Sequence, residues 1–387
     1  MDFDLTREQK MLQQSVREFI KDKIAPIAAD MDREGPMSKE NAHNFLKALE
    51  PFGYVGTLVP EKYGGPGLTS VEWGIIHLEL RKAYASLGGI VGITSTAASV
   101  ISNSDNKMIK EKILPSMLSG ERIGCLGITE PDAGSDPSSM ETTAVLDGDY
   151  FIINGNKMWI SNGSIADYVV LMATSKAVKK GREGICMLLV EKEVSPFKAS
   201  EIHKMGLKSF PTSELVFENC RVPKENLLYP VGKGFDQIQN ALIFARCNAA
   251  IAGVAIAEAA LEASIVHAKQ RVQFGKFIGE FQMIQQMIAE MIVEIDAAKL
   301  LTFRAFKLID DGKRCRKESS IAKAFSCEMV ARVASKAIQI HGAYGLAEEY
   351  PLERYFRDAR CYTIPDGTTQ IQQLIIAREA LGLSALK

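Results

Sequence analysis

The chain has 387 residues, of which 47% are hydrophobic and 24% are charged, and its formal net charge at pH 7 is −1. This composition is that of a soluble globular protein whose length suits two or three packed units. The near-zero charge gives no support to binding of nucleic acid or anionic lipid, and we expect no uncharged stretch long enough to span a membrane.

The first segment, residues 1–121, is predicted to be an N-terminal α-helical domain. Thr6-x-x-Gln9 and Thr69-x-x-Glu72 have the spacing of capping boxes, and apolar residues at helical spacing follow each of them. A loop rich in glycine and proline, residues 60–67, separates these helices.

The segment 122–232 is predicted to be a compact, mostly antiparallel and barrel-like β-domain. Short alternating stretches are separated by the pairs Asp147-Gly148, Asn154-Gly155 and Asn162-Gly163. Asn-Gly and Asp-Gly pairs between alternating stretches indicate β-hairpins, so we expect a hairpin at each.

The segment 233–387 is predicted to be a C-terminal helical bundle. Four long amphipathic stretches lie at 235–271, 280–312, 316–341 and 368–383, with a shorter helix near 352–358. The expected fold class is therefore α+β, in the order helices, β-domain, helices.

Cysteine and histidine usage favours a cytoplasmic protein without a metal site. The seven cysteines are scattered without a C-x-x-C pair, and the five histidines lie far apart. The start, Met1-Asp2-Phe3-Asp4, carries acids and no apolar run, so no secretion signal is expected.

Two segments of the β-domain are candidate cofactor contacts. The loop Ile128–Asp136 is rich in small and hydroxyl residues, which suits either an anion- or ring-binding loop or an ordinary surface turn. Trp159 stands on a strand just before a turn, where it can flank an aromatic cofactor or pack in the core. No G-x-G-x-x-G occurs, so a Rossmann-type dinucleotide site is unsupported.

Two segments of the helical bundle carry weaker signals. Arg271, followed by Phe274-Gly275 and a new helix, suits pyrophosphate binding or a simple inter-helix turn. The segment Gln339–Gly345 is a glycine-rich helix end, for which a plain C-cap is the alternative.

The segment Ile364–Gln372 carries the strongest signal. Asp366 and Gly367 immediately precede a helix start that Thr368 or Thr369 can cap. The free N–H groups and positive potential of a helix start make an adjacent carboxylate a candidate base, although a turn followed by a cap is the ordinary reading.

Taken together and in this order, these segments resemble the acyl-CoA dehydrogenase family over essentially the whole chain. The resemblance also rests on the Lys157–Gly163 strand, on Tyr350-Pro351 and on Arg357-Asp358-Ala359. It implies FAD bound between the β-domain and the C-terminal bundle, usually in a homotetramer. It further implies an acyl-CoA substrate and electron transfer to an electron-transferring flavoprotein.

The resemblance assigns roles to individual residues. Ser161 stands where the family more often has threonine, and Ala343 replaces a glycine that is usual there. Ser135, Arg246 and Gly367 are implied to contact the acyl-CoA substrate. The implied flavin contacts are Leu126, Ile128, Thr129, Gly134, Ser135, Trp159, Ser161, Arg271, Gln282, Gln339, Ala343, Thr368 and Gln370.

The reaction implied by the resemblance is an α,β-elimination, in which a carboxylate removes the α-proton and the β-hydrogen leaves as hydride to flavin N5. The family's commonest base segment is Ile-Tyr-Glu-Gly-Thr, whereas this chain has Ile-Pro-Asp-Gly-Thr. The alternative family position for the base is Ala245 here, which leaves Asp366 as the carboxylate at a family base position.

Aspartate is shorter than glutamate by roughly 1.5 Å, and a misplacement of about 1 Å can cost on the order of 100-fold in rate. A cyclic or α-branched acyl group, such as cyclohexane-1-carboxyl-CoA, would bring its α-proton closer and use the space left by tyrosine. A short linear acyl-CoA, a 1,4-elimination from a cyclic enoyl-CoA and a non-enzymatic flavin- or acyl-CoA-binding subunit are the alternatives.

Overall fold

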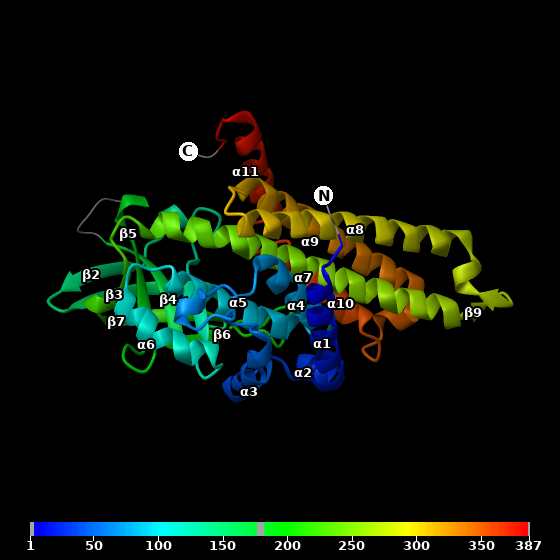
Figure 1. Cartoon of the computed structure of the whole chain (residues 1–387), viewed down its shortest axis with the longest axis horizontal. Coiled ribbons are helices and arrows are strands. Elements are labelled where there is room, and N and C mark those ends of the chain that lie inside the picture. The colour runs from blue at the N-terminus through cyan, green and yellow to red at the C-terminus, as the bar shows by residue number, and fades with distance from the viewer. Residues whose placement is uncertain (1–3, 176–181, 386–387) are drawn as a thin grey trace.

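The structure is a computed structural model that describes residues 4–175 and 182–385, so the expectation drawn from Met1–Phe3 lies outside it. Six helices form the N-terminal part: α1 (Arg7–Lys23), α2 (Ala28–Glu34), α3 (Lys39–Leu49), α4 (Ser70–Ala83), α5 (Ala85–Ser102) and α6 (Lys107–Leu118) (Figure 1). Both predicted capping boxes are confirmed, because Thr6 and Thr69 accept from the third residue of their helices and the reciprocal bonds are present.

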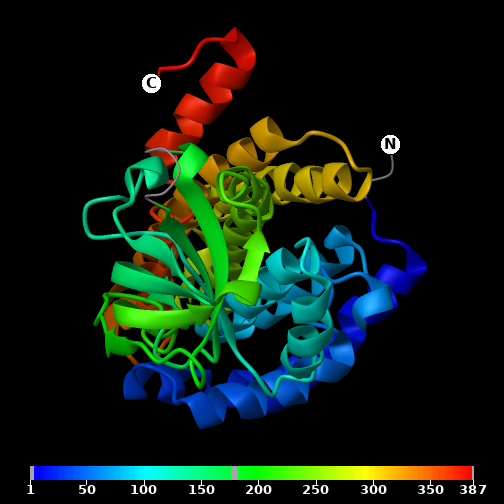
Figure 2. The same ribbon diagram turned by 90° about the vertical axis from the view of Figure 1, so that its left-hand side faces the viewer.

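The β-domain is one folded sheet with a hydrophobic core of its own (Figure 2). Its strands are β1 (Gly124–Gly127), β2 (Thr143–Asp147), β3 (Tyr150–Ser161), β4 (Tyr168–Thr174), β5 (Ile185–Glu191), β6 (Lys198–Glu201), β7 (Thr212–Pro223) and β8 (Leu227–Tyr229). They follow the order β6-β7-β3-β2-β4-β5-β8, with β1 paired to β4. Pairing is antiparallel except where β4 meets β1 and β2, so the prediction of a mostly antiparallel domain is confirmed.

One of the three predicted hairpins is confirmed and two are wrong. Asp147-Gly148 does join the antiparallel strands β2 and β3. Asn154-Gly155 instead lies inside β3, where the register with β7 shifts and Gly155 has φ +144°. A Cβ at Gly155 would lie 2.6 Å from the Thr142 Cα, so this glycine allows two backbones to approach closely. Asn162-Gly163 ends β3, but the next strand, β4, does not pair with it.

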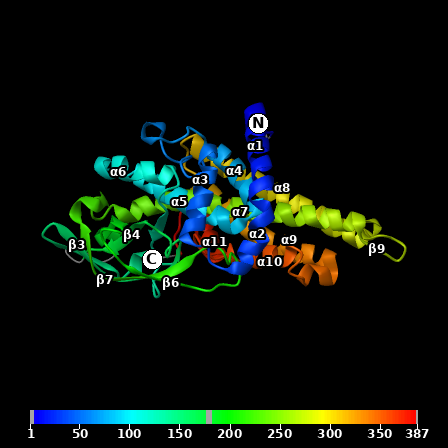
Figure 3. The ribbon, with the colours of Figure 1, turned by 90° about the horizontal axis from the view of Figure 1, so that it is seen from below.

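The C-terminal part consists of α7 (Gly234–Gln270), the short hairpin β9 (Val272–Gln273) and β10 (Lys276–Phe277), α8 (Gln282–Asp310), α9 (Arg316–His341), α10 (Leu352–Cys361) and α11 (Thr369–Leu381). These bounds confirm the five predicted helices to within three residues. Helices α7, α8 and α9 pack along their lengths, and α4 lies against α7 and α8 (Figure 3). The β9–β10 hairpin stands at the far tip of the bundle, and α11 projects from its side (Figures 1 and 2).

Two helices correct the expectation that no segment is long and apolar enough to cross a membrane. By length and hydropathy alone, α5 and α7 both qualify. However, 89% of the relevant window of α5 and 67% of that of α7 are buried inside the protein. Both are accounted for as core helices, which are apolar on most sides because other elements surround them.

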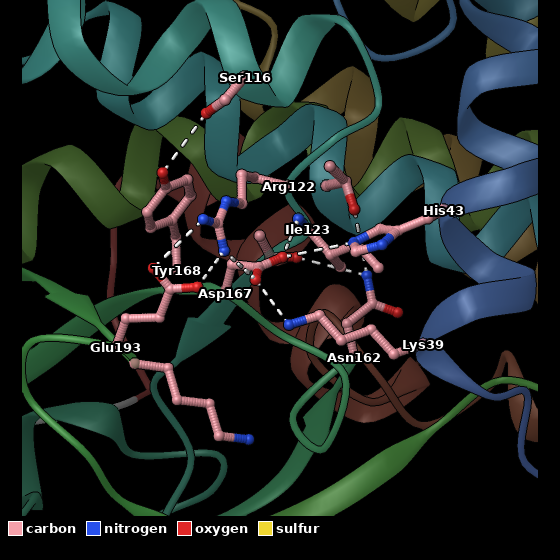
Figure 4. A network of polar contacts seen from close by, with 12 residues as sticks. Lys39, His43, Ser116, Arg122, Ile123, Asn162, Asp167, Tyr168 and Glu193 are labelled. Atoms are coloured by element: carbon pink, nitrogen blue, oxygen red, sulfur yellow. Dashed lines mark hydrogen bonds and ion pairs between the residues drawn. The ribbon is translucent and has the colours of Figure 1, made fainter.

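A buried carboxylate joins the N-terminal helices to the β-domain (Figure 4). Asp167 accepts hydrogen bonds from Lys39 Nζ at 2.6 Å, from Arg122 Nη1 at 3.0 Å and from the Ile123 N–H at 2.8 Å. Burial alone would raise the pKa of Asp167, but these three donors outweigh it and hold the pKa below its ordinary value. The network fixes α3 against the start of β4.

Candidate active site

The loop between α10 and α11 holds Asp366 in a fixed, unusual backbone conformation. Asp366 has φ +57° and Gly367 has φ +90°, so the chain passes through the left-handed region twice in succession. Lys323 Nζ donates to the Gly367 carbonyl at 2.9 Å and to the Thr363 carbonyl at 3.0 Å. Gln372 Nε2 donates to the carbonyls of Asp366 at 2.9 Å and Gly367 at 2.8 Å. The predicted cap is confirmed, because the Thr368 side chain accepts from the Ile371 N–H.

Three buried cations act electrostatically on the Asp366 carboxyl group. They are Arg81 of α4, Arg246 of α7 and Lys323 of α9, and none is more than 3% exposed. Burial raises the pKa of Asp366 to about 6, and the three cations limit that rise. Asp366 as a whole residue is half-buried, so part of its surface stays accessible.

Arg246 has free hydrogen-bond donors that a ligand could use. Its guanidinium group is buried, and its Nε and Nη1 lack a hydrogen-bond partner among the described residues. Burial, together with the neighbouring Arg316, lowers its pKa to about 10. Arg316 in turn lies in the field of Arg378, Glu379, Arg314 and Arg182, of which Glu379 is paired with Arg314. Such a gathering of guanidinium groups attracts phosphate and other anions.

Trp159 points away from the core of the β-domain. The register of β3 against β7 shifts between Lys157 and Ile160, and within this irregularity Trp159 has φ +62°. The indole side chain is 58% exposed, which rules out a packed core tryptophan. A bulky residue at positive φ is a strained backbone position, and such positions cluster at functional sites.

The end of β3 is clamped onto α5. Buried Asn162, at φ +64°, donates from Nδ2 to the Ile90 carbonyl at 2.9 Å and lies 3.3 Å from the Gly124 carbonyl. Ser161, just before it, is half-buried. The clamp brings the strand of Trp159 and Ser161 against the first turns of α5, where Arg81 also binds the Gly88 carbonyl.

Strand β1 carries Leu126, and the loop that follows it, with Ile128, Thr129, Gly134 and Ser135, is fixed by a buried ion pair. Lys157 Nζ lies 2.7 Å from Glu130 Oε1 and donates to the Ile128 carbonyl at 3.1 Å. The Glu130 carboxylate also accepts from the N–H groups of Glu141 and Thr142, which closes the loop on itself. Gly134 and Ser135 are left exposed, and a Cβ at Gly134 would meet nothing within 4 Å.

The remaining predicted flavin contacts divide into two groups. Thr368 and Gln370 start α11 beside Asp366. Arg271, Gln282, Gln339 and Ala343 instead lie at the hairpin end of the bundle, away from the β-domain (Figure 1). Arg271 follows Arg246 by 25 residues along α7, which is roughly 37 Å of helix. One copy of the chain therefore does not bring this second group to the Asp366 site.

A cavity of about 770 Å³ has no predicted site residue in its lining. It is bordered by the loop before α4, by the end of α5 and by the first turns of α7, including Phe244. Among the described residues, no cluster of three or more His, Cys, Asp or Glu side chains is arranged to hold a metal ion.

Sequence reasoning missed Arg81, Lys323, Asn162 and the Lys157–Glu130 pair. Arg81 had a detectable signal, because it is a charge on the apolar face of a helix that precedes the small-residue positions Gly88 and Gly92. Lys323 had none, since its role comes from a loop whose contacts lie 40 and 44 residues further along the chain.

Comparison with known proteins identifies relatives along the whole chain. The N-terminal, middle and C-terminal domain models of acyl-CoA dehydrogenase match residues 6–121, 125–220 and 232–381. A glutaryl-CoA dehydrogenase of Desulfococcus multivorans is 38% identical over 99% of both chains.

Solved structures agree. A chain from a structure of the electron transferring flavoprotein of Acidaminococcus fermentans has a TM-score of 0.94 at 35% identity and covers 98% of this chain and 100% of that chain. The butyryl-CoA dehydrogenase of Megasphaera elsdenii has a TM-score of 0.93 at 34% identity, with the same coverage.

Proposed function

Because this chain belongs to the acyl-CoA dehydrogenase family, we propose that it introduces an α,β double bond into an acyl-CoA thioester with Asp366 as the base. It is an FAD-dependent oxidoreductase with the three-part fold of that family. The half-buried Asp366, which lies before the capped start of α11 and in the field of three buried cations, is the observation that carries the proposed role of this residue.

The residues present fit the flavin cofactor. The exposed Trp159 ring offers an aromatic face, and the exposed loop at Gly134 and Ser135 leaves open space for a bound group. We propose that these residues, with Leu126, Ile128, Thr129, Thr368 and Gln370, hold the flavin. When bound, FAD supplies the acceptor for the β-hydrogen that leaves as hydride.

Asp366 is suited to take the α-proton. A pKa of about 6 leaves the carboxylate ionised at neutral pH and still more basic than an ordinary aspartate. Lys323 and Gln372 fix the loop through its carbonyl groups, so the carboxylate is held in place while its charge remains free. The α-proton moves to Asp366, and the electron pair of the broken C–H bond forms the double bond as the β-hydride departs.

Arg246 is proposed to bind the coenzyme A part of the substrate. Its two unpartnered guanidinium nitrogens need acceptors, and Arg316 adds positive potential on the same side. Phosphate and amide oxygens of coenzyme A provide such acceptors. Ser135 and Gly367 are the other proposed contacts.

We propose a cyclic or α-branched acyl group, with cyclohexane-1-carboxyl-CoA as the specific candidate. The support is the Pro365-Asp366 pair, which removes an aromatic side chain from the wall and shortens the base. The test is anaerobic titration with a panel of acyl-CoAs while flavin absorbance is followed. Faster bleaching by butyryl-CoA than by cyclohexane-1-carboxyl-CoA would reject this substrate class.

Substitutions of Asp366 test the base itself. Asp366→Asn should abolish turnover while the flavin stays bound, and retained turnover would place the base elsewhere. Asp366→Glu should shift preference toward linear acyl chains, and an unchanged profile would count against the steric argument.

A short linear acyl-CoA is the second candidate, because the similar enzymes include a butyryl-CoA dehydrogenase. A 1,4-elimination from a cyclic enoyl-CoA is disfavoured by a carboxylate at the α-carbon position, and product analysis by mass and NMR decides the point. A flavin-binding subunit without catalysis predicts no bleaching by any acyl-CoA.

We further propose a homotetramer that reduces an electron-transferring flavoprotein in the cytoplasm. Arg271, Gln282, Gln339 and Ala343 lie too far from Asp366 to complete a site within one copy, so a second copy would supply them. Large apolar side chains are exposed at the same end, with Phe274 95% and Met283 77% exposed. Light scattering tests the assembly, and stopped-flow reduction of the flavoprotein tests the partner. All seven cysteines are free, which supports a reducing compartment.

A further inference from the structure

Arg81 is a buried charge that lacks a carboxylate partner at ion-pair distance among the described residues. Its side chain is 2% exposed and lies between α4, α5 and α7. Its Nη2 donates to the Gly88 carbonyl at 2.6 Å and to Asn248 Oδ1 at 2.5 Å, and its Nη1 donates to the Asn248 carbonyl at 3.2 Å. All three acceptors are neutral, so none of them offsets the charge.

Two glycines of α5 make room for this guanidinium group. A Cβ at Gly88 would lie 2.3 Å from Arg81 Cγ, and a Cβ at Gly92 would lie 2.7 Å from Arg81 Nη2. Any other residue at either position would displace the side chain. Placing a cation in a glycine notch costs desolvation free energy, and burial indeed lowers the pKa of Arg81. Because this desolvation opposes folding, we looked for a role of the Arg81 charge in the activity of the protein.

A series of side-chain and backbone contacts connects Arg81 with the loop of Asp366. Arg81 binds Asn248, and the next residue along α7, Ala249, accepts from Cys327 Sγ of α9 at 3.7 Å. One turn earlier on α9, Lys323 holds the Gly367 carbonyl. Arg81 also interacts electrostatically with Asp366 and with Tyr362.

We propose that Arg81 is a positioning residue for the reaction, which acts through Asp366 by supplying a fixed, buried positive field that keeps the carboxylate ionised. This inference rests on the proposed role of Asp366 as the base. Lys323 and Arg246 supply the other two positive charges, and Arg81 adds the third from the N-terminal part of the chain. The charged and titratable groups that interact electrostatically with Asp366 are Lys323, Arg246, Arg81 and Cys327, and those that interact with Arg81 are Asp366, Tyr362, Tyr54 and His77.

Direct binding of an acidic acyl group by Arg81 is the competing assignment, and the geometry disfavours it. Both terminal nitrogens are already bound to protein acceptors. The unpartnered Nε faces Gly88, since a Cβ there would lie 2.9 Å from it, and so it does not face an open cleft.

The test compares Arg81→Met, which removes the charge at similar length, with Arg81→Lys, which retains it. The pH dependence of kcat/KM is measured on the FAD-loaded enzymes. In the methionine variant the acidic limb should move to higher pH by roughly one unit, which is a loss of about fivefold at pH 6 and little loss at pH 8. In the lysine variant the midpoint should stay near that of the native enzyme.

An infrared titration of the ligand-free holoenzymes gives the same midpoint without turnover, with Asp366→Asn used to identify the carboxyl band. An unchanged midpoint in Arg81→Met, or an equal shift in Arg81→Lys, would overturn the proposal. A rise in KM confined to glutaryl-CoA with the midpoint unchanged would assign Arg81 to substrate binding instead. Should the methionine variant not fold, Arg81→Gln replaces it, because glutamine is neutral and can still donate to the Gly88 carbonyl.

This pair of measurements separates the two proposals. If Asp366→Asn retains turnover, the proposed base is wrong, but the infrared midpoint still reports whether Arg81 controls the Asp366 charge. If Asp366→Asn is inactive and the midpoint does not respond to Arg81, the base stands and the role of Arg81 falls.

Discussion

Asp366→Asn should stabilise the folded protein at the same time as it abolishes turnover. Burial raises the pKa of Asp366 to about 6 from an ordinary value of 3.8. The folded protein therefore binds this proton more tightly than the unfolded chain, and stability falls as the pH rises from about 4 to 6. A pKa shift of about two units corresponds to a destabilisation of the folded protein by about 3 kcal/mol. This destabilisation is fully present above about pH 6 and absent below about pH 4.

Asparagine is neutral at every pH and removes this cost. For a chain of this length, about 3 kcal/mol corresponds to a rise in Tm of roughly 4 °C. Scanning calorimetry of the ligand-free holoenzyme between pH 4 and 8 measures the difference between variant and native protein. The difference should appear at pH 7.5 and vanish near pH 4.

Asp311→Asn is a matched control with the opposite sign. Hydrogen bonds from Lys307 and Lys313 hold the pKa of Asp311 below its ordinary value, so its charge favours the folded state. This control should lower Tm at pH 7.5 or leave it unchanged. A Tm for Asp366→Asn that is no higher than native at pH 7.5, or a gain that persists at pH 4, would refute the assignment of a strained, ionised carboxylate.

Three further predictions follow from the same contacts. The native kcat/KM should rise with pH through about 6 as Asp366 loses its proton, and a flat profile between pH 5 and 7 would contradict the proposed base. Lys157→Met leaves the Glu130 carboxylate buried without its cation, so it should lower the free energy of unfolding by about 3–5 kcal/mol and release flavin. Calorimetry measures the first effect and filtration of free FAD the second. The double change with Glu130→Met should recover part of the lost stability. Asp167→Asn should weaken urea resistance at pH 7 but differ less from the native protein as the pH falls below the ordinary carboxyl pKa, because the stability from a lowered carboxyl pKa is lost as the pH falls; equal resistance at pH 7 would refute the network's role.

The elements that local chemistry determines were predictable from the sequence. Thr6 and Thr69 cap their helices through residues three positions away, so the boundary is written within one turn. The bundle helices were also predictable from a local pattern, because their apolar periodicity extends over many turns. The position of Asp366 before a capped helix was likewise a local pattern.

The features that depend on distant strands were not predictable in this way. Asn154-Gly155 has the sequence of a hairpin turn, but β7 pairs on both sides of it and Thr142 lies against Gly155, so the pair becomes an irregularity inside β3. The exposure of Trp159 also follows from the register with β7. Neither outcome can be read from neighbouring residues.

The charges around Asp366 show the same division. Its own position was visible in the sequence, whereas Arg81 and Lys323 reach it from helices that lie far away along the chain. Similarly, α5 is longer and more apolar than the sequence analysis expected of any segment. Its apolar length is explained by burial of most of the helix inside the protein.

The length of α7 has a consequence for how this chain can change over evolutionary time. Its 37 residues make a rod of roughly 55 Å, which begins against β5 and ends at Arg271. A single inserted residue would turn everything beyond it by about 100° and lengthen the rod by about 1.5 Å. The helix thus fixes the distance and relative orientation of Arg246 and Arg271. Insertions and deletions should therefore accumulate in the surface loops, while the length of this helix stays constant.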